Sequence, residues 1–182
     1  PEPPVLAGTA GRGLVSLSWS VPDDGGAAVK QYTVWMSRDG GLTWRAISRT
    51  GKRSYVLRGL KNGWTYRFYV TARNRVGISP GSLDLDLTPR TVPTAPWNIT
   101  ATPGPGQLFI GWNAPKSDGG SAITDYVIEV SVGYRPWQLV ADGVSATTSY
   151  LLTNLPDTTP LVDGQKYRVR VRAVNGVGTG PV

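Results

Sequence analysis

The chain carries one sequence pattern twice, and this duplication limits the possible folds more than any other feature. Trp19 is followed by a proline and an Asp-Gly-Gly turn, and the same order recurs after Trp112, 93 residues later. A second pattern, Tyr-x-Φ-x-Val-x-Ala-x-Asn-x-x-Gly in which Φ is apolar, begins at Tyr66 and again at Tyr167. A repeat of this length is a whole domain, because solenoid units are shorter. We therefore expect two similar domains.

The periodicity of the apolar residues is that of β-strands. Apolar and polar residues alternate over 14–19, and most regularly over 66–74 and 167–175. Turn-forming Gly, Pro, Asn and Asp separate these runs, and no stretch keeps a helical period of 3.6. The sequence predicts an all-β fold with one β-sandwich over 1–91 and a second over 92–182.

These residues resemble the fibronectin type III domain in both halves of the chain. The resemblance depends on the two tryptophans, on a tyrosine in the third strand, on a leucine before the sixth strand and on the Tyr-x-Φ-x-Val pattern. The tyrosines are Tyr32 and Tyr126, and the leucines are Leu60 and Leu155. Leu155 lies twelve residues before Tyr167 instead of six, which suggests an insertion over Asp157–Asp163. The Asp-Gly-Gly turn looks like that of modules in bacterial surface and secreted proteins.

The resemblance implies two immunoglobulin-like, seven-stranded β-sandwiches, each with sheets A-B-E and G-F-C-C′. In the first module the implied strands are 5–10, 14–20, 30–37, 43–48, 54–58, 64–74 and 82–88. In the second they are 97–102, 107–113, 123–132, 136–141, 147–153, 165–175 and a last strand from 180. This last strand is nearly missing, and we expect it either to be truncated or to be supplied by a neighbouring chain.

The resemblance also implies which side chains face inward. They are Leu17, Trp19, Tyr32, Val34, Tyr66, Phe68, Val70 and Ala72 in the first module. In the second they are Ile110, Trp112, Tyr126, Ile128, Tyr167, Val169, Val171 and Ala173. The hydroxyl groups of the two corner tyrosines are expected to bond nearby backbone.

The composition excludes several classes of function. The chain has no cysteine and no histidine, so it lacks disulfides, thiolate metal sites and the commonest general base. The chain contains no run of about 18 apolar residues, so the sequence predicts no membrane-spanning helix. We expect no catalytic residue, no metal and no cofactor, and we do not expect an enzyme.

The net charge of +7 belongs to the first module. Residues 1–93 hold 13 Lys/Arg and 6 Asp/Glu, whereas residues 94–182 hold 6 of each. A basic face attracts acidic glycans, anionic surfaces or nucleic acid, but exposed charge is also the ordinary state of a domain surface. Nucleic acid is not the expected partner, and a salt-dependent titration with DNA would test that alternative.

The candidate binding face lies on the third and sixth strands of the first module. Trp35 is expected to point outward beside Arg67, Tyr69 and Arg73, where an aromatic face can stack on sugars or prolines and arginines can pair with anions. The alternative is a tryptophan covered by arginine stems or by an adjacent module. Two last-strand carboxylates, Asp84 and Asp86, are expected to form cross-strand ion pairs with the arginines. The corresponding face of the second module has the pattern of an ordinary charged surface.

A short proline-rich segment joins the modules. Pro93 and Pro96 favour an extended, semi-rigid connection, and Trp97 is expected to pack at the junction.

The sequence thus predicts a structural and adhesive tandem module that acts as a spacer and as a protein- or glycan-contact segment of a larger extracellular or cell-surface protein, expected to be bacterial. Its partners would be neighbouring modules and a protein or polysaccharide ligand. The alternatives are an accessory carbohydrate-binding region of a secreted polysaccharide-degrading enzyme and a phage virion tail or decoration component. Fold analogy supports much of this prediction, and fold alone does not determine function.

Overall fold

The computed structural model describes residues 1–182 and divides them into two compact units, Pro1–Arg90 and Thr91–Val182. Both units are built from strands and turns, without helices. The sequence assigns Thr91 to the first module, but its amide donates to the carbonyl of Gly119 at 2.9 Å, so the hydrogen bond places it in unit 2.

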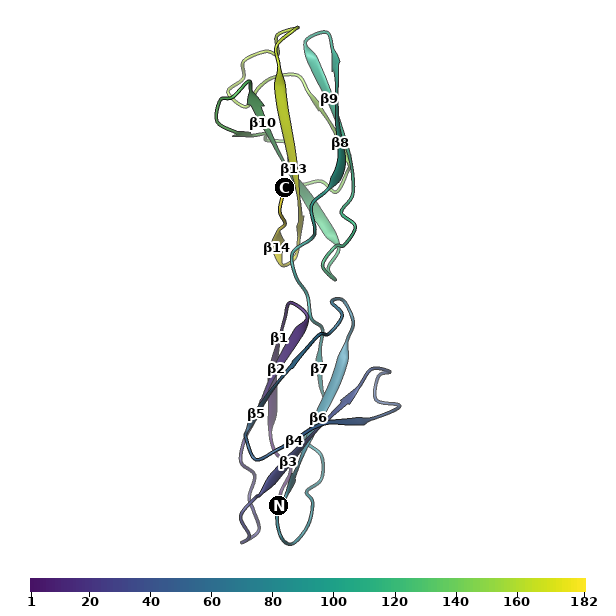
Figure 1. Ribbon diagram of the computed structural model, residues 1–182, viewed down its shortest axis with the longest axis vertical. Coiled ribbons are helices and arrows are strands. Elements are labelled where there is room, and N and C mark those ends of the chain that lie inside the picture. The colour runs from purple at the N-terminus through teal and green to yellow at the C-terminus, as the bar shows by residue number, and fades with distance from the viewer. The chain divides into compact units, whose positions relative to one another are not determined.

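Unit 1 is a sandwich of a three-stranded and a four-stranded antiparallel sheet (Figure 1). Its strands are β1 (Leu6–Gly11), β2 (Leu14–Trp19), β3 (Gln31–Ser37), β4 (Arg45–Thr50), β5 (Ser54–Arg58), β6 (Tyr66–Arg73) and β7 (Leu85–Leu87). The sheet orders are β1-β2-β5 and β4-β3-β6-β7. These orders confirm the expected A-B-E and G-F-C-C′ sheets.

Unit 2 repeats this arrangement, and three of its four edge strands are shorter than those of unit 1. Its strands are β8 (Trp97–Gly104), β9 (Gln107–Asn113), β10 (Ile123–Val132), β11 (Gln138–Leu139), β12 (Ser149–Leu152), β13 (Tyr167–Asn175) and β14 (Gly178–Thr179). The sheet orders are β12-β9-β8 and β11-β10-β13-β14. The sequence predicts that the last strand begins at residue 180, but β14 ends at Thr179 and no strand follows it.

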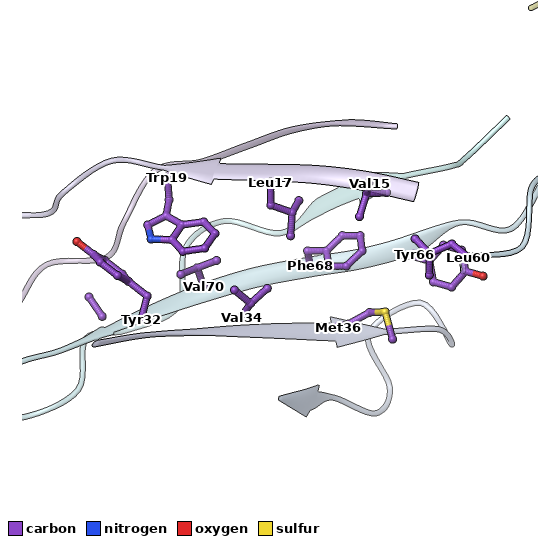
Figure 2. Packing of buried hydrophobic residues seen from close by; sticks show 11 residues of the cluster. Val15, Leu17, Trp19, Tyr32, Val34, Met36, Leu60, Tyr66, Phe68 and Val70 are labelled. Carbon is purple, nitrogen blue, oxygen red and sulfur yellow. The ribbon is translucent and has the colours of Figure 1, made fainter. Parts of the chain in front are cut away.

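The core of unit 1 lies between the two sheets, and every side chain that the sequence predicts to face inward is buried there. Figure 2 shows Leu17 and Trp19 pointing from β2 toward Phe68 and Val70 of β6. The ring of Trp19 packs on Tyr32 with centroids 5.6 Å apart. Each such burial contributes roughly 1.5–3 kcal/mol, which makes this apolar layer the main stabilising element of the unit.

The core of unit 2 has the same layer, centred on Trp112 and Tyr126, whose ring centroids are 5.2 Å apart. Tyr167 and Val169 differ from expectation, because they are only partly buried. The reason is that β10 covers only one side of β13 at these residues, and on the other side β14 pairs with β13 only at Val174 and Asn175.

The corner tyrosines accept backbone hydrogen bonds in both units. The amide of Lys61 donates to Tyr66 Oη at 2.9 Å, and the amide of Val162 donates to Tyr167 Oη at 2.8 Å. This geometry makes Leu161, which is 8% exposed, the counterpart of Leu60. The sequence assignment of that role to Leu155 is therefore wrong, because Leu161 has the six-residue spacing to Tyr167 that Leu60 has to Tyr66, and the extra residues lie before Leu161.

The outer face of β10 and β13 is a compact ion-pair cluster and not an ordinary charged surface. Glu129 is only 9% exposed and receives two hydrogen bonds from Arg170, at 2.9 and 2.8 Å. Arg172 lies 3.2 Å from the same carboxylate. The ring of Trp137 contacts the guanidinium groups of Arg168 and Arg170, which lie 5.1 and 4.4 Å from its centroid. The charged and aromatic side chains of this face are therefore engaged with one another.

The segment that enters unit 2 is held by close backbone contacts. Besides the Thr91 amide bond to Gly119, the Thr91 carbonyl accepts a hydrogen bond from Asn175 Nδ2 at 2.8 Å, and the Thr94 amide donates to Ser117. Gly119 has φ of +74°, and a Cβ at that position would overlap the Thr91 carbonyl oxygen. Only glycine fits there.

We predict that Gly119→Ala is much more disruptive than Gly25→Ala at the equivalent turn of unit 1. Gly25 has φ of +62°, and no atom lies within 4 Å of the place that a Cβ would take, so its cost is the left-handed backbone alone, about 1–2 kcal/mol. Gly119→Ala adds a backbone clash and should cost roughly 3 kcal/mol or more. Urea unfolding and hydrogen exchange at the Thr91 amide would measure both effects. Equal costs, with unchanged exchange at Thr91, would contradict this account.

We also predict a pH-dependent role for Glu129. The hydrogen bonds from Arg170 hold the pKa of this carboxyl below its ordinary value of 4.5. A lowered folded-state pKa contributes stability above the unfolded value, and this contribution is lost as the pH falls through the folded value. Glu129→Gln should therefore cost about 1–3 kcal/mol at pH 7, and its difference from the wild type should shrink as the pH falls below 4.5. Urea unfolding at several pH values would measure this, with the exposed Glu2→Gln as control. A difference that does not depend on pH would contradict the prediction.

Candidate functional site

Three aromatic side chains form a half-buried row on the outer face of the four-stranded sheet of unit 1. Trp35 on β3 pairs directly with Tyr69 on β6, and their rings are nearly parallel, with an interplanar angle of 13° and centroids 5.7 Å apart. Trp44, just before β4, meets Tyr69 edge-on at 4.5 Å. Tyr69 is thus enclosed between two tryptophans, and its burial, with the Asp84 carboxylate nearby, raises the pKa of its hydroxyl.

A pinned turn positions Trp44. The Asp39 carboxylate accepts hydrogen bonds from the Ser37 hydroxyl at 2.6 Å and from the amide and hydroxyl of Thr43. These bonds hold the pKa of Asp39 well below its usual range. The carboxylate therefore fixes the loop between β3 and β4, and with it the place of the second tryptophan.

Arg67 is occupied by partners within unit 1. It donates from Nε and Nη2 to the two oxygens of Asp86, at 2.7 and 2.8 Å, and from Nη1 to the Gly40 carbonyl. Asp84 lies 3.9 Å away. The sequence predicts that Arg67 and Arg73 share these two carboxylates, but Arg73 pairs with neither, because β7 is only three residues long and ends opposite Phe68.

A groove of about 410 Å³ opens on the other side of Trp35. Arg49 and Arg73 flank it, and neither has a carboxylate within 4.0 Å. The remaining lining is polar or aliphatic: Gln31, Thr33, Thr71 and Ile78. The Thr71 hydroxyl accepts a 3.4 Å hydrogen bond from Trp35 Nε1, which fixes the indole ring at the groove.

A second hollow, of about 430 Å³, continues this groove and shares Gln31 and Arg73 with it. It adds Lys30 and Arg75, two further exposed cations without an ion-pair partner. The two hollows form a continuous surface with free positive charge, polar hydrogen-bonding groups and one aromatic wall. We call it the basic groove.

The structure thus divides the four residues of the predicted binding face. Trp35 and Arg73 line the basic groove, whereas Arg67 and Tyr69 lie beside it, in an ion pair and in aromatic packing. Sequence reasoning did not identify Arg49, which faces Thr33 across the β3–β4 pair. A β-bulge between Val34 and Trp35 shifts the β4 register, so alternation alone could not place it.

The junction residues predicted from the sequence belong to unit 2. Pro93 and Pro96 are buried there, and the Pro93 carbonyl oxygen would lie 2.5 Å from a Cβ at Gly180. Trp97 is 49% exposed, and the Lys116 ammonium lies 5.6 Å from its ring centroid. Its role at the junction stays a prediction.

The chain holds no cluster of three or more acidic, histidine or cysteine side chains that could bind a metal ion. The structure contains no helix that is long and apolar enough to cross a membrane. The chemistry that the basic groove offers is recognition, through charge, hydrogen bonds and one aromatic ring.

Comparison with known proteins agrees with the fold. The chain is 29% identical over 177 residues to the human cell adhesion molecule DSCAM, a match that covers 90% of this chain and 8% of that protein. It is 34% identical to human myomesin-2 over 136 residues, covering 71% of this chain and 9% of the relative. It is also 34% identical to the Kelch domain-containing protein SSO1033 of Saccharolobus solfataricus over 125 residues, a match that covers 69% of this chain and 16% of that protein. The chain spans less than a fifth of the length of each of these relatives.

Among solved structures, the chicken CNTN1 FN1-FN3 domains match with a TM-score of 0.48 and 20% identity, over all of this chain and 64% of that one. The family model of the fibronectin type III domain matches twice, over residues 4–88 and 94–182. These two matches, together with the two repeated sandwiches, show that the chain belongs to the fibronectin type III family as a tandem pair of domains.

Proposed function

We propose that the chain is a non-catalytic spacer and adhesive segment of a larger extracellular or cell-surface protein, and that its first domain contacts an acidic glycan through the basic groove. The relative with the name of a cell adhesion molecule supports an adhesive role for such tandem domains. The single observation that carries the ligand proposal is the position of Trp35 beside two arginines, Arg49 and Arg73, that have no ion-pair partner.

The charge distribution favours an anionic ligand. Unit 1 holds the whole excess of +7, and the ion pairs within it use only one of its arginines, Arg67. Arginine recognises carboxylate and sulfate groups through paired hydrogen bonds, and free guanidinium groups on a concave surface concentrate such anions. An unpaired arginine on each side of one groove therefore fits a ligand with regularly spaced acidic groups.

The rest of the groove favours a sugar over a peptide. A tryptophan ring offers a flat apolar surface for the C–H face of a pyranose ring. Thr33, Thr71 and Gln31 provide hydroxyl and amide groups, which both donate and accept hydrogen bonds as sugar hydroxyls do. The groove volume of about 410 Å³ is in the range of small-ligand sites. An accessory carbohydrate-binding region of a polysaccharide-degrading enzyme would use the same groove and differ in its parent protein.

We predict that the chain binds immobilised polygalacturonate or hyaluronan and that Arg49→Gln combined with Arg73→Gln weakens this binding at least tenfold. The reason is the loss of two charge-assisted contacts, each worth about 1.5 kcal/mol or more. The control is the pair Arg53→Gln and Arg58→Gln, which removes the same charge from another exposed part of unit 1. Biolayer interferometry at about 50 and about 300 mM NaCl would measure affinity, which should fall with salt.

The tryptophans provide a second matched comparison. Trp35→Ala should weaken binding to the acidic polysaccharide, whereas Trp64→Ala should not, although Trp64 is 50% exposed. Equal binding to a neutral glucan would exclude acidic groups as the determinant. Binding to poly-glutamate or to DNA as strong as to the polysaccharide would show that the groove recognises charge alone, and would overturn the glycan proposal.

A further inference from the structure

The three-stranded sheet of unit 2 carries no charged residue. Asp, Glu, Lys and Arg make up 17% of the chain, yet residues 97–115, which contain β8 and β9, and residues 143–156, which contain β12, hold none. Each of the other three sheets has at least one arginine in its strands. The outer side of the sheet β12-β9-β8 is therefore an uncharged surface on a protein whose other sheets are basic (Figure 1).

An aromatic ring lies at the centre of this surface. Phe109 on β9 points away from the core, because its neighbours Leu108 and Ile110 are buried, and it is half exposed. Its Cε1 lies 3.9 Å from the place that a Cβ of Gly111 would take, so the ring leans toward a position without a side chain. One face of the ring is thus open to solvent, and no neighbouring side chain on β9 stands over it.

The neighbouring strands place an aliphatic group and several hydroxyl groups around the ring. Leu151 on β12 and Thr102 on β8 lie directly opposite Phe109, one on each side. Ser149 and Thr100 flank Gly111 in the same way. Two rows across three strands span about 10 Å by about 7 Å. We call this surface the neutral face; it consists of Thr100, Thr102, Phe109, Gly111, Ser149 and Leu151.

Unit 1 shows that the sandwich does not require an aromatic residue here. Ser16 on β2 occupies the position of Phe109, since it precedes the core residue Leu17 as Phe109 precedes Ile110. Ser16 lies opposite Val56, as Phe109 lies opposite Leu151. A half-exposed phenylalanine therefore has no structural role that the other copy of the scaffold shares, and exposed apolar patches of this kind often mark binding sites.

The size of the apolar patch favours a small ligand over a second copy of the chain. An aromatic side chain buries about 150–250 Å², so half-exposed Phe109 presents roughly 100 Å², and Leu151 adds a similar area. A stable protein–protein interface buries about 800 Å² on each partner. The patch supplies a fraction of that area, which suits one or two rings of a small ligand.

The composition of the neutral face favours a sugar without charge. The open face of Phe109 can stack on the C–H face of a pyranose ring, and the hydroxyl groups of Thr102 and Ser149 can both donate and accept hydrogen bonds. An ionic group would lose its hydration without gaining a partner of opposite charge. Leu151, beside the ring, needs an apolar group on the sugar, and the methyl of an acetamido substituent provides one.

We propose that the neutral face of unit 2 binds an uncharged glycan that contains N-acetylated hexosamine. A pyranose ring would stack on Phe109, and the acetyl methyl of the same or the next sugar would contact Leu151. The hydroxyl groups on β8 and β12 would bond the sugar hydroxyls on either side. This site is in unit 2 and the basic groove is in unit 1, so each proposal can fail without the other.

Two oligosaccharides with the same β-1,4-linked backbone test the proposal. Fully acetylated chitohexaose should bind the 182-residue chain at least tenfold more tightly than cellohexaose, because contact of one small apolar group is worth about tenfold or more. NMR titration should shift the amides of Thr102, Gly111 and Ser149. The affinity should be the same at about 50 and about 300 mM NaCl, because no charged group takes part.

Matched variants separate the ring from the aliphatic contact. Phe109→Ser introduces the residue that unit 1 carries, and it should weaken binding of chitohexaose at least tenfold. Leu151→Ser should weaken binding of chitohexaose and leave that of cellohexaose unchanged. Val56→Ser, at the equivalent position of unit 1, is the control and should change neither. Thermal unfolding of each variant shows whether the fold is kept.

Equal affinity for the two oligosaccharides, or no binding of chitohexaose at millimolar concentration, would overturn the proposal. So would equal loss of affinity in Leu151→Ser and Val56→Ser. Loss of chitohexaose binding in the double variant Arg49→Gln, Arg73→Gln would assign the sugar to the basic groove. Self-association of the chain in sedimentation experiments that Phe109→Ser abolishes would assign the neutral face to a second copy.

Discussion

The burial of one face of each sheet against the other is the interaction on which the rest of the structure depends. In unit 1 it joins β2 to β3 and β6 through Leu17, Val34, Phe68 and Val70, with Trp19 packed on Tyr32. Because successive residues of a strand face opposite sides, fixing these inward positions also fixes which residues face outward. The core therefore determines which residues form the aromatic row and the basic groove, although no groove residue belongs to the core. Changes on the outer face leave the core register intact, so two copies of one scaffold can present different surfaces.

The two outer faces show how far this freedom extends. In unit 2, Glu129 is buried and pairs with Arg170 and Arg172, and the Trp137 ring packs against the guanidinium groups of Arg168 and Arg170, so the arginines of that face are engaged by its own residues. In unit 1 the position opposite Tyr69 holds Trp35, the carboxylates lie on β7 and just before it, and they reach only Arg67. The cations farther along the face are left free. Both faces carry arginines, so the positions of the acidic residues decide whether those arginines are paired within the face or free to bind a ligand.

The sequence was sufficient for the fold and for most of the core, and it was insufficient for the groove. Alternation and the repeated tryptophan and tyrosine identify strands and inward residues because both follow from the local two-residue period. The place of Arg49 at the groove could not be predicted from the sequence, because a β-bulge in the β3–β4 pair changes the register between the two strands. Leu161 is a different case, because its six-residue spacing to Tyr167 is the same as that of Leu60 to Tyr66 and was already present in the sequence; the hydrogen bond at Tyr167 confirms it. The ion-pair cluster around Glu129 combines residues from two strands with Trp137 from a loop, so no pattern along one strand predicts it.

The last strand connects these observations. In unit 1, β7 completes the core with Leu85 and Leu87, and its aspartate neutralises the arginine at the start of β6. One short strand thus performs both the apolar and the ionic closure of its edge. In unit 2 the strand at this position, β14, pairs with β13 only at Val174 and Asn175, and Val169 is partly exposed where Phe68 is fully buried.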